Sequence, residues 1–254
     1  MNGLNCYLDL ICICLMQIHN GSIFSDYELV PHASLENHLF EIGSPGMEPL
    51  SWNKRLDIAS GVAQALAYLH TFSPNQFVHS DLKASNILLD GNYNAKLSNF
   101  GLERLGKTGE LSHQSTHSVG TSLYIDQEEI TTGHSYVKSD VYRFGVTLLQ
   151  LLTGLQAIER NRPREWQNLI EWGKPLLLNE RNLKTIMDVR IEGQYSSKAA
   201  FRAAQITLKC LALDPKSRPS MKEVVEELEQ IQAIEERIKQ SENTSMPSSE
   251  HRDL

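Results

Sequence analysis

The 254-residue sequence has little basic charge, few cysteines and no long hydrophobic run. Its net charge of −7 at pH 7 argues against the clustered basic surface that nucleic-acid-binding proteins need. The four cysteines include one close pair, Cys12 and Cys14, but no second pair completes a zinc site. We therefore expect reduced structural thiols in a cytoplasmic protein that does not bind nucleic acid.

The N-terminal region also lacks the features of a targeting or membrane segment. The apolar stretch from Leu8 to Ile18 is too short to span a bilayer, and Asp9 interrupts it. No Lys or Arg occurs before Lys54, so the positive region of a signal peptide is absent. Gly3 does not directly follow the first Met, as myristoylation would require. The sequence therefore predicts a buried strand here and no intrinsic membrane anchor.

The first recognisable elements are a β-hairpin and a short helix. We predict strands over Leu8–Leu15 and Ser22–Leu29, with His19-Asn20-Gly21 as the turn, because Asn-Gly is typical of tight hairpins. Ser34 has the chemistry of an N-cap for a helix that ends near Phe40.

The rest of the chain has the pattern of helices around two short strands. Apolar residues at helical spacing predict a helix from Ser51 to His70 with one buried face, formed by Trp52, Leu56, Ala59, Ala63, Leu66 and Leu69. Two short strands are predicted, at Ile87–Leu89 and near Ala95–Leu97. The further predicted helices are Ser139–Leu152 with Gly154 as C-cap, Trp166–Trp172 and Ala199–Leu211. A last helix is expected to start at the capping box Ser220–Glu223. The polar residues 241–254 are expected to be a disordered tail.

One loop between the long helix and the first of these strands carries the candidate chemistry. The segment from His79 to Asn86 places Asp81, Lys83 and Asn86 close together in sequence, with regular elements on both sides. A carboxylate, an amine and an amide on one loop can hold a hydroxyl next to a phosphate. The alternative is structural, because the same side chains could cap the loop and satisfy one another.

The loop resembles the catalytic loop of eukaryotic protein kinases, H-R-D-L-x-x-x-N, and Asn99-Phe100-Gly101 resembles their metal-binding D-F-G. Four further segments resemble plant receptor-like cytoplasmic kinases of the serine/threonine type: Ser34–Phe40, Tyr136–Tyr142, Leu152–Gly154 and Arg218–Met221. The resemblance covers roughly Leu8 to Gln232. It implies a mainly α (α+β), protein-kinase-like fold with a nearly complete helical C-lobe.

In this interpretation residues 1–30 are a remnant of the kinase N-lobe, with its last strands and hinge, and residues 31–240 are the C-lobe. The resemblance implies that Asp81 accepts the substrate hydroxyl proton, Lys83 steadies the transferring phosphate and Asn86 holds a magnesium ion. Three residues would remain from the adenine site, Glu28, Val30 and Leu88. Structural roles are implied for His79, Phe100, Thr121, Glu128, Asp140 and Arg218. Among these, Glu128 is expected to pair with Arg218, and Asp140 to hold the backbone of the loop.

The sequence departs from the family pattern where metal and phosphate would bind. Asn99 stands where the family has a metal-binding Asp, and the loss of ~4 kcal/mol of metal stabilisation would slow the reaction roughly a thousandfold. Ser80 replaces the Arg that pairs with a phosphate on the activation segment, which holds Ser112, Ser115, Thr116 and Ser118. No G-x-G-x-x-G motif and no Lys precede the expected hinge, so we expect the upper half of the nucleotide site to be absent.

Three hypotheses follow from this combination. The first is a pseudokinase that acts by binding a protein partner, such as an active kinase or a receptor. The alternative is a serine/threonine kinase with residual activity, and only this alternative requires ATP and Mg²⁺ as cofactors. The third is a truncated reading frame with an unstable product.

Overall fold

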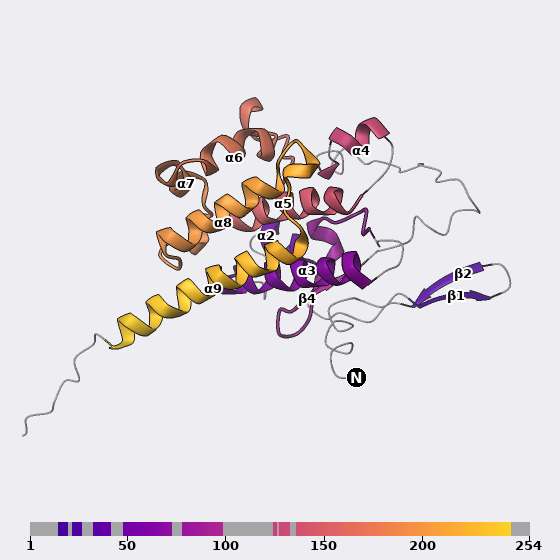
Figure 1. Ribbon diagram of the computed structural model, residues 1–254, viewed down its shortest axis with the longest axis horizontal. Helices are drawn as coiled ribbons and strands as arrows, with labels where there is room; N and C mark the ends of the chain where they lie inside the picture. The colour runs from indigo at the N-terminus through magenta and orange to yellow at the C-terminus, as the bar shows by residue number, and fades with distance from the viewer. Residues whose placement is uncertain are drawn as a thin grey trace, which may run out of the picture.

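The computed structural model describes residues 15–19, 22–26, 33–41, 48–72, 78–98, 124–125, 127–132 and 136–244 (Figure 1). The α-helices are α2 (Leu35–Phe40), α3 (Trp52–Phe72), α4 (Gln127–Thr132), α5 (Val137–Thr153), α6 (Leu169–Leu177), α7 (Glu180–Ile186), α8 (Ser197–Cys210) and α9 (Met221–Thr244). The strands are β1 (Leu15–His19), β2 (Ser22–Asp26), β3 (Ile87–Leu89) and β4 (Ala95–Leu97). They form two antiparallel pairs, β1 with β2 and β3 with β4. Among the described residues no helix is both long and apolar enough to cross a membrane.

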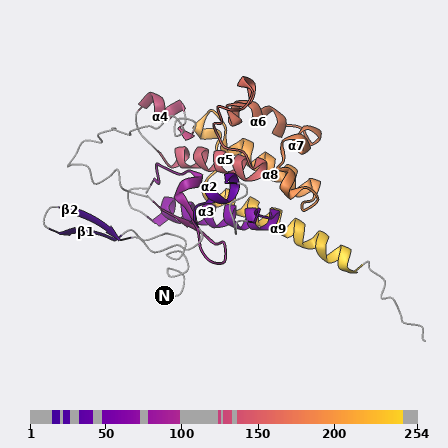
Figure 2. The same cartoon turned by 180° about the vertical axis from the view of Figure 1, so that it is seen from behind.

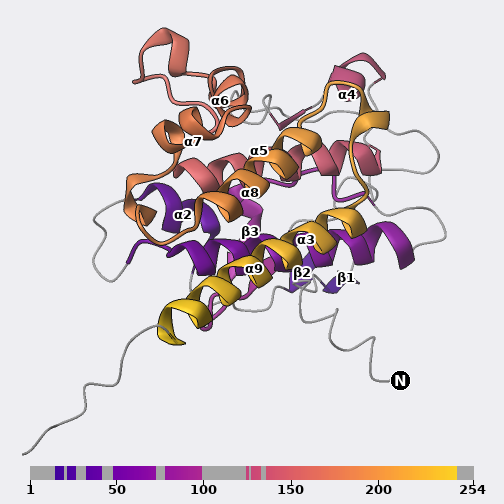
Figure 3. The ribbon, with the colours of Figure 1, turned by 60° about the vertical axis from the view of Figure 1, so that its left-hand side comes forward.

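Helix α5 forms the centre of the core. Its residues are buried almost without interruption from Ser139 to Thr153. Helix α8 packs on α5, while α9 runs beside α3, as two views of the ribbon show (Figures 1 and 3). Gly145 permits the close approach of α5 and α8, since a Cβ added there would lie 2.8 Å from the Cβ of Cys210. The C-terminal part of α9 extends past the other helices (Figure 2).

Helix α3 confirms the prediction drawn from its apolar spacing. The six residues expected on its inner face are all buried: Trp52, Leu56, Ala59, Ala63, Leu66 and Leu69. The helix starts one residue after Ser51, whose carbonyl accepts the first helical hydrogen bond, from the backbone N–H of Arg55 at 3.0 Å. It then continues to Phe72, two residues past the predicted end.

The ends of α5 and α9 form as their capping residues predict. Gly154 adopts the left-handed conformation with φ of 65°, and its N–H donates to the carbonyl of Gln150 at 2.8 Å. At the start of α9, the N–H of Ser220 donates to Glu223 Oε2 at 2.7 Å, and the Glu223 N–H donates back to Ser220 Oγ at 3.3 Å. Helix α9 ends at Thr244, so it includes the first residues of the expected tail.

Two predicted elements differ in position. The β-hairpin is present, but β1 occupies residues 15–19 and includes His19, which was expected in the turn. His19 pairs with Ser22, so only two residues separate the paired positions, and this matches the short connection that Asn-Gly favours.

The helix predicted at 166–172 is α6 and starts at Leu169, because Asn168 Oδ1 accepts from the N–H groups of Ile170 and Glu171 at 3.0 and 3.2 Å. The proposed domain boundaries at residues 30 and 240 stay predictions.

Candidate active site

The central loop from His79 to Asn86 lies between α3 and β3 and passes the N-terminal end of α5. Its last three residues, Ala84–Asn86, form a 3₁₀ turn that leads directly into β3. Leu82 and Ala84 are buried at 0% and 2% exposure, so they fix the loop to the core. Asp81 precedes Leu82, and Lys83 lies between Leu82 and Ala84. The side chains of Asp81 and Lys83 remain partly exposed.

Asp140, in the first turn of α5, holds the backbone of this loop. Its Oδ2 accepts the backbone N–H of His79 at 2.7 Å, and its Oδ1 accepts the N–H of Ser80 at 3.1 Å. His70 Nε2, at the end of α3, lies 3.0 Å from Oδ2. Burial of Asp140 acts to raise its pKa, but the hydrogen bond and charge of His70, with His79 and Arg143 nearby, lower the pKa below its usual value. The ionised carboxylate therefore accepts both backbone N–H groups of the loop.

The side chain of His79 connects the loop to the end of β4. Its Nε2 lies 3.0 Å from the carbonyl of Ser98, and its Nδ1 accepts the backbone N–H of Asp81 at 3.4 Å. These partners select the neutral tautomer with the proton on Nε2. Burial lowers the pKa of His79, which agrees with a neutral ring. Ser98 also donates its N–H to the carbonyl of Asn86 at 3.0 Å, so both ends of the loop are fixed to the residue that precedes Asn99.

Asp81, Lys83 and Asn86 come together as one cluster. Lys83 Nζ lies 3.0 Å from Asp81 Oδ2, and Asn86 Nδ2 donates to the same oxygen at 2.8 Å and to the Asp81 carbonyl at 2.7 Å. Asn86 is buried, whereas the Asp81 and Lys83 side chains are 34% and 27% exposed. Asp81 is therefore oriented by its neighbours and remains partly exposed. The same contacts satisfy the structural alternative, in which the side chains stabilise the loop itself.

The chemistry of this cluster partly fits a magnesium site. Mg²⁺ prefers anionic oxygen ligands with nearly octahedral geometry. Asn86 contributes an amide and Asp81 a carboxylate, but among the described residues no cluster of three or more His, Cys, Asp or Glu side chains could hold a metal ion. Asn99 lies outside the described residues. The residues present thus supply oxygen donors but little negative charge for a divalent ion.

The strand that carries Leu88 also contacts the segment just after the expected hinge. Leu88 forms a bridge with Ser34, and the N–H of Leu89 donates to the carbonyl of Ala33 at 3.0 Å. Leu88 is half-buried and pairs with Lys96 of β4. Glu28 and Val30, which were expected to form the rest of an adenine site, lie outside the described residues.

The expected ion pair between Glu128 and Arg218 stays a prediction. Glu128 lies in α4, but its side chain is outside the described part, as are Phe100 and Thr121. Arg218 is buried, and its guanidinium donates to backbone carbonyls of Ala212 at 2.9 Å and Lys138 at 2.8 Å. These bonds attach the segment before α9 to the start of α5.

Sequence reasoning missed two polar contacts near the cluster. Tyr124 donates its hydroxyl to Gln150 Oε1 at 2.7 Å, and burial raises the pKa of Tyr124. Both residues line a cavity of about 230 Å³ that also includes Lys83. The bond between His70 and Asp140 was missed as well. No spacing rule could have found these contacts, because each joins residues that are far apart in the sequence.

Comparison with known proteins identifies the class to which this fold and loop belong. The family model for protein tyrosine and serine/threonine kinases matches residues 7–228, and the chain belongs to this family. The mostly helical structure corresponds to the C-lobe of a kinase-like fold.

The similar curated proteins are plant kinases. The chain is 48% identical to the probable serine/threonine-protein kinase PBL11 of Arabidopsis thaliana over 92% of its own length and 59% of that protein. It is 48% identical to receptor-like cytoplasmic kinase 176 of rice, with coverage of 83% and 53%, and 44% identical to the Arabidopsis serine/threonine-protein kinase BIK1, with coverage of 88% and 55%. The chain therefore spans a little over half the length of these relatives. The sequence-based resemblance to plant receptor-like cytoplasmic kinases is confirmed.

Proposed function

We propose that this protein is a serine/threonine protein kinase of low activity, with Asp81 as the group that accepts the substrate hydroxyl proton. The observation that supports this function is the cluster of Asp81, Lys83 and Asn86, in which Lys83 Nζ and Asn86 Nδ2 lie 3.0 and 2.8 Å from Asp81 Oδ2. Asp140 holds the backbone immediately before Asp81, so the carboxylate is positioned before any substrate binds.

Each residue of the cluster has a separate role in this proposal. Asp81 orients the serine or threonine hydroxyl and takes its proton as the oxygen becomes a nucleophile. Lys83 places a positive charge beside that carboxylate, where it can stabilise the charge of a transferring phosphoryl group. When bound, Mg-ATP would supply the phosphoryl group and neutralise charge on its oxygens, with Asn86 as one metal ligand.

Asn99 is the reason for proposing low activity. An amide oxygen can coordinate Mg²⁺ but brings no negative charge to the site. If ~4 kcal/mol of metal stabilisation is lost, the rate of phosphotransfer falls roughly a thousandfold relative to a site with a carboxylate. Manganese should support the reaction better than magnesium, because Mn²⁺ generally binds a given ligand set more tightly and is less strict in its geometry.

A second candidate function is a cytoplasmic pseudokinase that binds another kinase or a receptor. The same Asn99 favours it, together with Ser80, which stands where the family has an Arg that pairs with a phosphate. The residues that hold the loop, such as His79 and Asp140, have no need of nucleotide for their contacts. In this case the loop would be a structural feature of a binding module.

A phosphotransfer assay of the full-length protein separates the two functions. Purified protein is incubated with labelled ATP and a general protein substrate, once with Mg²⁺ and once with Mn²⁺. The matched variants are Asp81→Ala and Asp57→Ala, of which the second removes an exposed carboxylate on α3. The kinase proposal predicts weak transfer that Asp81→Ala abolishes and Asp57→Ala leaves unchanged. Absence of transfer, or transfer that persists in Asp81→Ala, would reject it in favour of the pseudokinase.

A further inference from the structure

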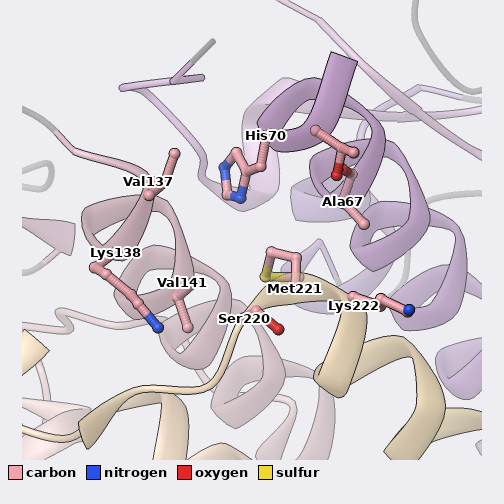
Figure 4. A pocket seen from close by; sticks show the side chains of 9 residues that line it. Ala67, His70, Val137, Lys138, Val141, Ser220, Met221 and Lys222 are labelled. Atoms are coloured by element: carbon pink, nitrogen blue, oxygen red, sulfur yellow. The ribbon is translucent and has the colours of Figure 1, made fainter. Parts of the chain in front are cut away.

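A second cavity is lined in part by His70, the residue that contacts Asp140 from the end of α3. It has a volume of about 190 Å³ and is lined by the last turns of α3, the first turn of α5 and the first turn of α9. His70, Val137, Val141 and Met221 face a common space between these helices (Figure 4). None of these four residues belongs to the Asp81 cluster, so the proposed phosphotransfer does not account for this cavity.

The lining of the cavity is positively charged although the chain as a whole is acidic. Of its 9 lining residues, His70, Lys138 and Lys222 are basic and none is acidic. Lys138 Nζ donates to the carbonyls of Arg218 at 2.5 Å and Pro219 at 3.1 Å, so its charge is held in place at one wall. Two helices also begin here, and their N-terminal ends add partial positive charge.

The acidic groups around this cavity are already engaged. Glu223 Oε2 accepts from both the N–H and the Oγ of Ser220 at 2.7 Å, which places its charge at the helix end. Asp140 is fully buried behind His70 and accepts from the central loop. The other ring nitrogen of His70, Nδ1, has no partner among the described residues. Nε2 of His70 bonds to Asp140, which leaves Nδ1 as the ring nitrogen for a ligand in the cavity.

The size and the apolar walls limit the ligand further. Ala67, Val137, Val141 and Met221 supply an apolar surface. In another protein, a cavity of about 150 Å³ holds one benzene molecule, so about 190 Å³ has room for a ring with a small charged substituent. We propose that this α3–α5–α9 pocket binds a small aromatic carboxylate, with the ring against the apolar walls, the carboxylate beside His70, and the two lysines at the sides of the pocket adding positive charge.

Binding should also affect the central loop. A carboxylate that bonds to Nδ1 of His70 fixes the ring in the orientation in which Nε2 bonds to Asp140. Asp140 in turn accepts the backbone N–H groups of His79 and Ser80. The occupied pocket therefore favours the ordered loop, whether or not the protein transfers phosphate.

The test uses benzoate as the probe and calorimetry on the full-length protein. Two reference compounds separate the parts of the interaction: benzamide keeps the ring without the charge, and inorganic phosphate keeps charge without the ring. We expect benzoate to bind at millimolar concentration, at least about tenfold more tightly than either reference compound, a difference of about 1.4 kcal/mol. Equal affinity for benzamide, or no binding of benzoate, would overturn the proposal.

Matched variants locate the site. Lys222 and Lys198 are both exposed and each is the second residue of a helix, but only Lys222 lines the pocket. Glu at this helix position is favourable, so both Lys→Glu variants should fold. Lys222→Glu is expected to weaken benzoate binding about fivefold or more and Lys198→Glu by less than about twofold. Equal effects of the two variants would contradict the assigned location.

Two further measurements test the apolar wall and the connection to the loop. Ala67→Leu fills the space for the ring and should abolish benzoate binding without a change of charge, while thermal unfolding verifies that the variant is folded. Saturating benzoate should slow amide hydrogen exchange at His79 and Ser80 in the unmodified protein but not in His70→Gln. Unchanged binding in Ala67→Leu would refute the pocket, and unchanged exchange would refute its connection to the loop.

Discussion

Replacement of Asp140 by Asn tests how the central loop is held. The native carboxylate accepts the N–H of His79 at 2.7 Å, the N–H of Ser80 at 3.1 Å and a bond from His70 at 3.0 Å. Asn keeps one acceptor oxygen and turns an NH₂ group toward donors, so at least one buried N–H loses its partner. A buried unsatisfied group costs about 1–3 kcal/mol, and the bonds that remain lose their charge assistance. We therefore expect a loss of about 3 kcal/mol in the free energy of unfolding.

This loss should be visible in thermal unfolding. For a protein of this size, 1 kcal/mol corresponds to about 2–4 °C, so Asp140→Asn should lower Tm by about 6–12 °C. The matched control is Asp57→Asn, at an exposed carboxylate that accepts from Gln232 Nε2 at 2.8 Å, and it should change stability by less than about 0.5 kcal/mol. Amide exchange of His79 and Ser80 should become faster only in the Asp140 variant. A Tm within about 2 °C of the unmodified protein would refute this role of Asp140.

The pH dependence gives an independent signature of the same carboxylate. The pKa of Asp140 is lowered in the folded protein relative to its ordinary value of 3.8. The stabilisation it provides is therefore present above the unfolded pKa and is lost as the pH falls through the folded value. Between about pH 5 and pH 3 the unmodified protein should lose more stability than Asp140→Asn. Parallel pH profiles of the two proteins would contradict an ionised Asp140.

Three further predictions concern contacts that hold the helices of the core together. In the native protein Arg55 Nη2 lies 2.6 Å from Asp188 Oδ2. Asp188→Ala leaves Arg55 buried without this partner, so it should lower the free energy of unfolding, measured with denaturant, by about 3–5 kcal/mol. Gly145→Ala should cost about 1–3 kcal/mol by the same measurement, since the added Cβ would lie 2.8 Å from that of Cys210 and force α5 and α8 apart. Ser220→Ala should cost about 1 kcal/mol in the free energy of unfolding, because α9 loses its N-cap. Thermal unfolding followed by circular dichroism measures this loss. A change below about 0.5 kcal/mol in any of the three would contradict the corresponding contact.

Much of the fold could be predicted because its signals are local. The inner face of α3, the strands Ile87–Leu89 and Ala95–Leu97, and the caps at Gly154 and Ser220 follow from periodicity and capping chemistry within a few residues. Such features depend little on the rest of the chain.

Other elements could not be placed from local signals. Helix α7 was not predicted, although Asn179 Oδ1 caps it by accepting the N–H of Arg181 at 2.9 Å. Asn is common in turns as well as at helix starts, so a short amphipathic segment after it is ambiguous. Helix α9 continues to Thr244 although its last residues are polar, because its preceding turns are anchored by contacts such as that of Glu235 with Ser196.

For the candidate site, the resemblance predicted which residues lie on the loop and that Asp140 holds the loop backbone, but not the other side chains that surround them. The resemblance pointed to Asp81, Lys83 and Asn86, and their sequence proximity alone allowed contact. The bonds from His70 to Asp140 and from Tyr124 to Gln150 depend on how distant helices pack, so only the structure could reveal them. The basic lining of the α3–α5–α9 pocket likewise combines residues from three helices.

The most direct test of the proposed function is the phosphotransfer rate of Asn99→Asp in the presence of Mg²⁺. If the cluster around Asp81 is a working proton acceptor limited by a weak metal site, restoring the carboxylate should raise the rate by up to about a thousandfold. The gain should disappear in the double variant with Asp81→Ala. A rate for Asn99→Asp equal to that of the unmodified protein, or a gain that survives the loss of Asp81, would contradict the proposal that this loop transfers phosphate.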